Sequence, residues 1–547
     1  MAKNSALPAG RTAALPNATR TEYSAAEQNN NRRQRLKPIR LMAGIFTVGV
    51  WTLASRVLGF ARDILLVALL GSGPVAQAFL IAFSLPNMFR RFFAEGAFNM
   101  AFVPMFSKKL QAGEAPERFA QDAFAGLAGV LVVFTGLALL AMPWLVAAMA
   151  SGFIGDARFD MAVVMGRIAF PYILFISLAA LLSGVLNATG RFAAAAAAPV
   201  LLNVLFVAAL LLGDSMGWDL GLVMAWTVPV AGVAQLALVW EAARRAGFTL
   251  RPTLPRLTPD LRRLAVIAAP AALAGGVVQV NLLVGRQVAS FFDGAIVWLY
   301  TADRLYQLPL GVVGIAVGVV LLPELSRRLA AGDDAGGRDA FNRATEIGLA
   351  LTLPAAVALC VIPGPLISVM FERGAFDASD TAATAWALAI YGLGLPALVL
   401  QKVLQPLFYA REDTASPFRY ALVAMGVNAA VAIGLAPVVG FTAAAWALTL
   451  SGWAMLWLLW RGSRRMGATV ALDERLLWRL PRIVFACAVM GAVLWGGAWV
   501  LAPALETAIL RYAALLALIL SGCVAYFGAA HVTGGLRLDE VRAALRR

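Results

Sequence analysis

Long apolar stretches recur along almost the whole chain and restrict it to one fold class. Many of them run for 18 residues or more between breaks made by Pro, Gly or charged residues. A helix needs about 20 apolar residues to cross the hydrocarbon core of a bilayer. The pattern therefore predicts an all-α polytopic membrane protein with no large soluble domain.

The breaks divide the apolar sequence into fourteen predicted spans. We expect them near residues 41–70, 75–107, 119–150, 160–188, 193–213, 219–243, 261–292, 295–326, 340–371, 379–409, 416–438, 440–460, 481–503 and 508–531. The polar, basic segment 1–36 has no apolar core before a cleavage site. It is predicted to be a disordered cytoplasmic tail rather than a signal peptide.

The basic residues between the spans alternate with span number, which predicts the orientation of the chain. Loops after even-numbered spans hold most of the Lys and Arg, whereas loops after odd-numbered spans, such as 71–74, hold few. Because basic loops stay in the cytoplasm, both termini are predicted to be cytoplasmic. The same rule, together with attraction to anionic lipid, explains the net charge of +15. The sequence has no basic patch with interleaved aromatic residues, so nothing in it indicates nucleic acid as a partner.

Two similar segments indicate an internal duplication. Residues 104–110 read PMFSKKL and residues 323–329 read PELSRRL, an offset of 219 at which Tyr172 also matches Tyr391. A repeated unit of six spans returns to its starting side, so its two copies are parallel. We expect an N-lobe at 37–250, a C-lobe at 251–466, and spans 13 and 14 with a cytoplasmic C-terminal tail at 467–547.

The residues that most enzymes use for catalysis are scarce in this chain. Its three cysteines lie in apolar runs without metal-ligand spacing, it has one histidine, and it has no Walker A motif. No acid or metal cluster stands apart from the arginines, which argues against a membrane-embedded glycosyl- or phosphotransferase. We expect a transporter with no cofactor or metal, and the sequence leaves sodium or proton coupling open.

Four arginines lie within or beside the apolar spans: Arg56, Arg62, Arg90 and Arg304. A charge at the centre of a membrane helix costs roughly 2.5–3.5 kcal/mol, so such residues usually face a wet cavity. A cavity lined with fixed positive charge indicates an anionic cargo. The alternative is that these side chains extend to the membrane interface or join structural salt bridges.

Span 1 places Arg56 and Arg62 six residues apart, which directs them about 120° from each other on a straight helix. Gly59 between them permits a bend that turns both toward one target. Asp63 is expected to hold Arg62 while the site is empty.

Spans 2 and 8 supply the other charges. In span 2, Arg91 and Glu95 are four residues apart and are expected to pair, which leaves Arg90 as the less committed cation. In span 8, Asp303 is the expected counter-ion of Arg304. The repeat places Arg304 on the opposite wall of a cleft between the lobes.

Arginine is the preferred donor for phosphate, since its planar guanidinium makes bidentate bonds and stays charged. Arginines converging from two lobes, with Arg286 of span 7 as a further candidate, suit a pyrophosphate. A cation or drug antiporter would need free membrane carboxylates, but Asp63, Glu95 and Asp303 each have an arginine within four residues. The pattern therefore favours an anionic cargo.

Three strings carry a family resemblance: SRVLGFARD at 55–63, LPNMFRRFFAEGAFNMAFVP at 85–104 and TADRLYQLP at 301–309. Over residues 40–530 the chain resembles the MurJ (MviN) family of lipid II flippases, within the multidrug/oligosaccharidyl-lipid/polysaccharide exporter superfamily. The resemblance implies fourteen helices, the last two forming a hydrophobic groove. It implies translocation of the undecaprenyl-pyrophosphate peptidoglycan precursor across a bacterial inner membrane, and hence a role in cell-wall biogenesis and cell shape.

The resemblance also assigns roles to residues. The family's essential cavity arginines correspond to Arg56, Arg62 and Arg304, with Arg90 beside them, and its gate residues to Ser55, Asp63, Asn87 and Glu95. Two positions depart from the family pattern: Gln77 stands where an aspartate is common, and Gln307 where a glutamate is often found. Both changes remove negative charge near a gate and leave the arginine set intact.

The expected mechanism is alternating access by rocking of the two lobes, with the polyprenyl tail in lipid along spans 13 and 14. An inside-negative potential favours outward movement of an anion, at about 2.3 kcal/mol per charge per 100 mV. The expected partners of this predicted monomer are lipid II and the bilayer, with other cell-wall synthesis proteins as further candidates. An exporter of another polyprenyl-linked glycan of the O-antigen type and, more distantly, a cation or drug antiporter stay open as alternatives.

Overall fold

The computed structural model describes residues 41–91, 93, 97–249 and 253–536. Within these residues the regular secondary structure is helical, apart from one isolated β-bridge between Arg373 and Phe376, and turns and loops join the helices. The predicted all-α fold class is therefore confirmed. The predicted tail at 1–36 lies outside the described residues.

The helices form two bundles and a C-terminal pair. The first bundle, here called the N-lobe, contains α2 (Leu41–Leu70), α3 (Pro74–Arg90), α4 (Ala97–Ala112), α5 (Pro116–Leu140), α6 (Met142–Met149), η2 (Ser151–Phe153), α7 (Ala157–Ala169), α8 (Tyr172–Ala188), α9 (Ala193–Ser215) and α10 (Leu220–Arg245). The second bundle, the C-lobe, contains α11 (Pro259–Ser290), α12 (Ala295–Ala330), α13 (Asp334–Val361), α14 (Pro363–Phe371), α15 (Ala378–Tyr409), α16 (Ala415–Val439), η3 (Gly440–Thr442), α17 (Ala443–Ser463) and η4 (Arg464–Val470). The C-terminal pair consists of α18 (Glu474–Val500) and α20 (Leu510–Val532), joined by the short α19 (Ala502–Glu506).

Each predicted span coincides with one long helix or with two consecutive helices. Spans 3, 4 and 9 are each interrupted beside a proline, at Pro143, Pro171 and Pro363. Proline lacks the N–H that continues a helical ladder, which explains these interruptions. In the part of the chain that the structure describes, nine helices are long and apolar enough to cross a membrane. The polytopic class is thus supported, while the count of fourteen stays a prediction.

Aromatic packing fixes the end of α3 that carries the charged residues. The ring centroid of Phe89 lies 5.0 Å from that of Phe134 in α5 and 5.8 Å from that of Phe170 beside α7. Edge-to-face pairs of this kind add about 0.5–1.5 kcal/mol each beyond the area they bury. The last turn of α3 is therefore held against two other N-lobe helices.

Buried polar contacts attach the C-terminal pair to the C-lobe. Glu346 of α13 is only 4% exposed and accepts hydrogen bonds from Arg479 at 2.5 Å and Arg475 at 3.3 Å, both in α18. In α20 the Tyr526 hydroxyl donates to the Ala350 carbonyl of α13 at 2.5 Å. Both long helices of the pair are thus fixed to α13.

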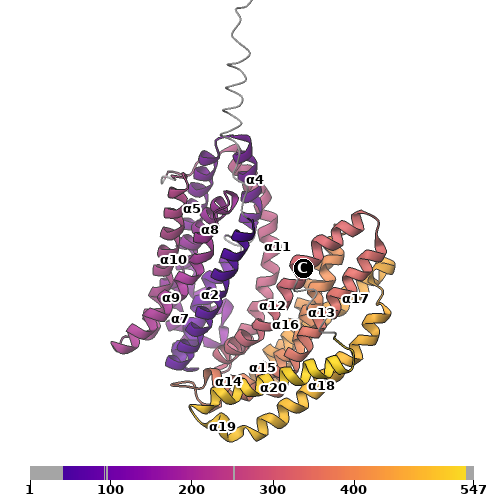
Figure 1. The fold of residues 1–547 in the computed structure, drawn as a ribbon. Coiled ribbons are helices and arrows are strands. Elements are labelled where there is room, and N and C mark those ends of the chain that lie inside the picture. Colours follow the sequence, from indigo (N-terminus) through magenta and orange to yellow (C-terminus); the bar gives the residue numbers. More distant parts are fainter. Residues whose placement is uncertain (1–40, 92, 94–96, 250–252, 537–547) are drawn as a thin grey trace, which may run out of the picture.

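The two lobes meet at one end and diverge toward the other, as Figure 1 shows. At the converging end the Ala375 N–H donates to the Ala68 carbonyl at 2.7 Å, and the Ser151 N–H donates to Gln287 Oε1 at 2.7 Å. The helix α11 begins at the diverging end against the N-lobe, and its last turns pack on α16 and α17. Because α11 contacts both bundles, the predicted boundary at residue 251 stays a prediction.

Candidate functional site

The carboxylate of Asp63 joins the two lobes. Its Oδ1 accepts hydrogen bonds from Arg62 at 2.7 and 3.1 Å and from the Tyr300 hydroxyl at 2.8 Å. Its Oδ2 lies 3.2 Å from Nε of Arg304. Arg62 belongs to α2 of the N-lobe and Arg304 to α12 of the C-lobe. Asp63 is only 3% exposed, and the low local dielectric of a buried site strengthens these contacts.

The N-lobe sets the direction of Arg62. Its Nη1 donates to Asn203 Oδ1 at 3.1 Å, and its guanidinium carbon lies 5.5 Å from the centre of the Phe206 ring. Asn203 in turn donates to the Ser55 carbonyl at 2.9 Å. Gly59 faces this amide, and a Cβ built there would lie in ordinary contact with the Asn203 amide nitrogen at 3.4 Å. The α2–α9 contact therefore orients Arg62 before any ligand binds.

Arg304 reaches the same carboxylate from the C-lobe. Its guanidinium carbon lies 4.3 Å from the centre of the Tyr300 ring, a cation–π contact. Its side chain is 32% exposed, against 10% for Arg62, so Arg304 is the more accessible of the two. Asp303, the expected counter-ion, instead accepts a hydrogen bond from Gln307. Asp303 and Arg304 are neighbours in α12, and adjacent residues of a helix point about 100° apart. Asp303 therefore faces Gln307, while Arg304 faces Asp63.

Arg56 lies between the lobes at a second point. It is exposed, and its Nη1 approaches Gly311 of α12 so closely that a Cβ built there would be 2.8 Å away. Gly311 follows Arg304 by about two turns, and Arg56 precedes Arg62 by nearly two. Arg56 is therefore displaced from Asp63 toward the diverging end.

A second group of charges surrounds Asp303. The guanidinium groups of Arg91, Arg286 and Arg304 all lie within electrostatic range of its carboxylate. A cavity of about 150 Å³ beside them receives side chains from α3 and from the C-lobe, among them Ser84, Arg286, Tyr300, Asp303 and Asn428. Arg286 thus lies with the charges of span 8.

The remaining predicted residues of span 2 lie near the end of α3. Asn87 donates to the Phe83 carbonyl at 2.8 Å, one turn back and beside the helix-internal Pro86. Arg90 is half-buried as the last residue of α3, and the following Arg91 is exposed. Glu95 lies outside the described residues, and so does its expected pair with Arg91.

Gln77 lies at the converging end, away from the arginines of the cavity. It is buried, donates to the Ser72 carbonyl at 3.0 Å and accepts from Arg158 Nη1 at 3.2 Å. The same nitrogen lies 2.8 Å from Asp293 of the C-lobe. Hydrogen bonds from the backbone and side chain of Arg158 hold the pKa of Asp156 below its ordinary value. Gln77 therefore supports an ion pair between the lobes.

Sequence reasoning missed four residues of this arrangement. Asn203 is a lone amide within an apolar span, and Tyr300 precedes Arg304 by four residues, which places both on one helix face. These two signals were available in the sequence. The pairing of Arg158 with Asp293 joins residues of different lobes, and no local pattern indicates it.

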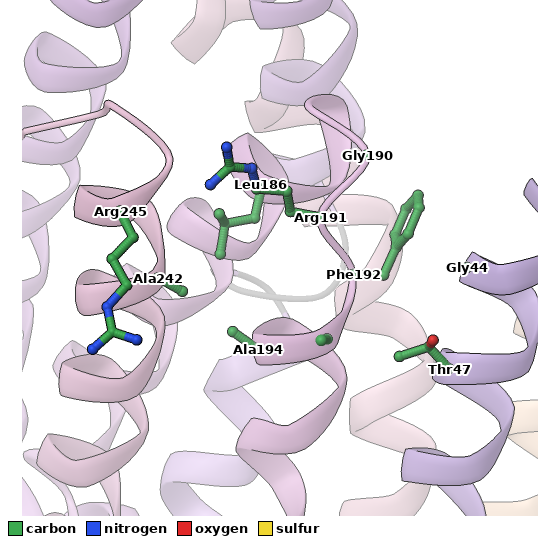
Figure 2. Close-up of a pocket in the computed structure, with 10 residues that line it drawn as sticks. Gly44, Thr47, Leu186, Gly190, Arg191, Phe192, Ala194, Ala242 and Arg245 are labelled. Atoms are coloured by element: carbon green, nitrogen blue, oxygen red, sulfur yellow. The ribbon is translucent and has the colours of Figure 1, made fainter. Parts of the chain in front are cut away.

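A larger cavity of about 490 Å³ lies apart from this site, at the diverging end of the N-lobe. Figure 2 shows Thr47 of α2, Arg191 and Arg245 around it. Arg245 is already paired with Glu241 at 2.8 Å. The residues that line this cavity include none of the arginines that meet Asp63. Among the described residues, no group of three His, Cys, Asp or Glu side chains is placed to hold a metal ion.

Comparison with known sequences gives consistent results. The family model described as "Lipid II flippase MurJ" matches residues 66–514. The chain is 44% identical to the probable lipid II flippase MurJ of Rhizobium tropici, over 93% of this chain and 97% of that protein. It is 35% identical to the lipid II flippase MurJ of Burkholderia cenocepacia, over 78% of this chain and 85% of that protein.

Comparison with solved structures gives the same fold. The chain superposes on a lipid II flippase MurJ in an inward closed conformation with a TM-score of 0.74, at 22% identity over 89% of this chain and 98% of that one. An inward-facing multidrug resistance MATE transporter of the MOP superfamily gives a TM-score of 0.63, at 13% identity over 76% of this chain and 95% of that one.

Proposed function

We propose a mechanism from the premise that this chain belongs to the MurJ family of lipid II flippases, as the sequence resemblance predicted. The chain is a transporter and not an enzyme. It moves lipid II, the polyprenyl-pyrophosphate-linked peptidoglycan precursor, from the cytoplasmic to the periplasmic leaflet of the bacterial inner membrane by alternating access.

The observation that carries the mechanism is the shared carboxylate of Asp63. One acid holds Arg62 and Arg304, which come from different lobes, and both of its oxygens are used. A pyrophosphate offers more acceptor oxygens and more negative charge than a carboxylate, and it suits the planar fork of arginine. The pyrophosphate therefore displaces Asp63 and binds between the two guanidinium groups.

Three further arginines mark the path into this site, of which Arg56 and Arg91 are exposed and Arg286 is half-buried. Arg56 lies between the lobes toward the diverging end, and Arg286 and Arg91 lie near Asp303. The head group meets these charges first and then moves toward Asp63. Beside this path lie the further cavity arginine Arg90 and two gate residues, Asn87 and Ser55. We also propose a gate role for Glu95.

The contacts at the converging end fit the inward-facing half of the transport cycle. This end carries loops 71–73 and 372–377, which follow odd-numbered spans and hold few basic residues. The positive-inside rule places it at the periplasmic face. The lobes are thus joined on the periplasmic side, and the charged path opens toward the cytoplasm.

The lipid tail stays outside the lobes. The C-terminal pair presents exposed apolar side chains, with Trp495 72% and Trp499 81% exposed. The polyprenyl chain lies along this pair in our proposal. The membrane potential drives the anionic head group outward.

The test is transport by purified protein in vesicles with an imposed inside-negative potential. Arg62→Ala and Arg304→Ala should each abolish lipid II transport, and Arg62→Lys should restore little because it lacks the bidentate fork. Arg245→Gln, at an exposed arginine of α10, is the matched control and should transport normally. Full activity of both alanine variants contradicts the site. Equal transport of an O-antigen carrier lipid would instead favour the broader glycan exporter.

A further inference from the structure

Two arginines meet at the converging end of the C-lobe without an acidic partner. Arg373 follows α14 and Arg511 lies in the first turn of α20, two helices that contact each other. Within the described part of the chain, neither forms an ion pair with a carboxylate, although Glu372 and Asp377 are near in sequence. Each uses neutral oxygens instead.

The bonds of this pair leave donors unused. Arg373 Nη2 donates to the carbonyls of Val369 at 2.8 Å and Met370 at 2.6 Å. Arg511 donates through Nη1 to the Glu372 carbonyl at 3.2 Å and through Nη2 to the Tyr512 hydroxyl at 3.3 Å. The Nε atoms of both arginines are buried and have no hydrogen-bond partner. Neutral oxygens therefore compensate the charge of the two guanidinium groups only in part, and an anion at their other nitrogens would stabilise the pair.

The Tyr512 hydroxyl lies beside both arginines. Arg511 Nη2 donates to it at 3.3 Å, and Arg373 lies close enough to act on it electrostatically. Two adjacent guanidinium groups without a counter-ion attract an anion, and their planar forks fit phosphate oxygens. The chemistry of the pair therefore selects a phosphate group.

The surroundings select a phosphate that is attached to a lipid. Exposed apolar side chains flank the pair, with Ile509 85%, Leu510 53% and Leu516 58% exposed. A tyrosine and two arginines beside such a surface are typical of the level of lipid head groups. A lipid bound here places its phosphate on the arginines and its chains along α20.

We propose that Arg373, Arg511 and Tyr512 form a binding site for the phosphate of a membrane lipid, separate from the Asp63 site. The lipid is either a glycerophospholipid or a polyprenyl phosphate, and both present the same chemistry to the arginines. The site does not depend on lipid II transport, so its test and that of the transport mechanism can fail independently.

The experiment measures protection of arginines from phenylglyoxal in the purified full-length protein, read peptide by peptide by mass spectrometry. The probes are dioctanoyl phosphatidic acid, farnesyl pyrophosphate, dioctanoylglycerol and inorganic phosphate at equal concentration. At least one of the two phosphate lipids should slow modification of Arg373 and Arg511. Protection by one alone identifies the source of the phosphate.

Variants separate binding from folding. Arg511→Gln should weaken protection of Arg373 about 10- to 100-fold, the contribution of a charge-assisted hydrogen bond. Arg482→Gln, an arginine stacked on Trp478 in α18, is the matched control and should leave protection unchanged. Unchanged modification of the remaining arginines reports that Arg511→Gln is folded.

Three results would overturn the proposal. They are no protection by either phosphate lipid, equal protection by dioctanoylglycerol, and equal protection by inorganic phosphate. The second would show that apolar contact suffices, and the third that the lipid is irrelevant.

Discussion

Replacing Asp63 by asparagine should separate substrate binding from transport. An amide at this position would keep the shape of the side chain but lose the charge that holds Arg62 and Arg304 together. In the proposed mechanism this carboxylate competes with the pyrophosphate for both arginines. Its neutralisation should therefore tighten binding of the lipid head group. It should also slow transport, because no internal anion replaces the substrate on the arginines after release.

The structure sets the size of the effect. Asp63 is buried and receives two bonds from Arg62, one from Tyr300 and an ion pair from Arg304 at 3.2 Å. A hydrogen bond to a charged group contributes about 1.5–3 kcal/mol. If lipid II no longer has to break one such bond in order to bind, its affinity should rise about 10- to 100-fold. Removal of repulsion between the carboxylate and the pyrophosphate acts in the same direction.

The assay compares lipid II binding to purified protein, by native mass spectrometry, with lipid II transport in vesicles. Asp63→Asn should bind at least about tenfold more tightly than the unchanged protein and transport more slowly. Asp160→Asn, at an exposed acid in the first turn of α7, should change neither quantity. Weaker binding by Asp63→Asn, comparable to that of Arg62→Ala, would refute the competition between Asp63 and the substrate.

Three further substitutions test other parts of the account. Gly311→Ala should displace the Arg56 guanidinium, since a Cβ there lies 2.8 Å from Nη1, and should lower transport without loss of membrane insertion; unchanged transport would remove Arg56 from the path. Arg158→Ala should loosen the converging end, because it removes the ion pair with Asp293. Since Asp293 is exposed and such pairs contribute about 0–1 kcal/mol, the population of long distances between spin labels on loops 71–73 and 372–377 should rise by up to about fivefold. No change in that distribution would show that the ion pair does not hold the lobes. Glu346→Gln should lower the free energy of unfolding by about 3–5 kcal/mol, because it leaves the buried Arg479 without its counter-ion. The melting temperature should fall accordingly, and an unchanged melting temperature would show that Glu346 does not stabilise the contact between α13 and α18.

Hydropathy and proline predict most of the fold, because both act locally. Each predicted span contains a helix, and Pro143, Pro171 and Pro363 mark where three of them are interrupted. The path of α11 was not predictable from local pattern. Its first turn is tied to the N-lobe by an ion pair between Lys109 and Asp260 at 3.0 Å, 151 residues apart in sequence.

In the candidate site, too, contacts between neighbours in the sequence were predictable and contacts between the lobes were not. Arg62 and Asp63 are adjacent, so their pairing follows from the sequence. The repeat placed Arg304 on the other lobe but did not indicate which acid it meets, and Asp303 was chosen because it is adjacent in the chain. The helix geometry turns Asp303 toward Gln307 and leaves Asp63 as the ion-pair partner of Arg304.

The two departures from the family pattern have structural counterparts. Gln77 accepts a hydrogen bond from Arg158, which an aspartate would turn into a second ion pair at the same nitrogen. Gln307 donates to Asp303, whereas a glutamate would bring a second negative charge there. Both glutamines thus fit a neutral role beside a charged partner.

In the proposed mechanism, Arg62 and Arg304 hold one pyrophosphate between the two lobes. The most direct measurement is a double-mutant cycle on lipid II affinity with Arg62→Ala, Arg304→Ala and the double variant. If both arginines hold the same group, the loss in the double variant should be clearly smaller than the sum of the two single losses, since either substitution already breaks the shared site. Strictly additive losses would mean that the two arginines act at separate places, and would contradict the account.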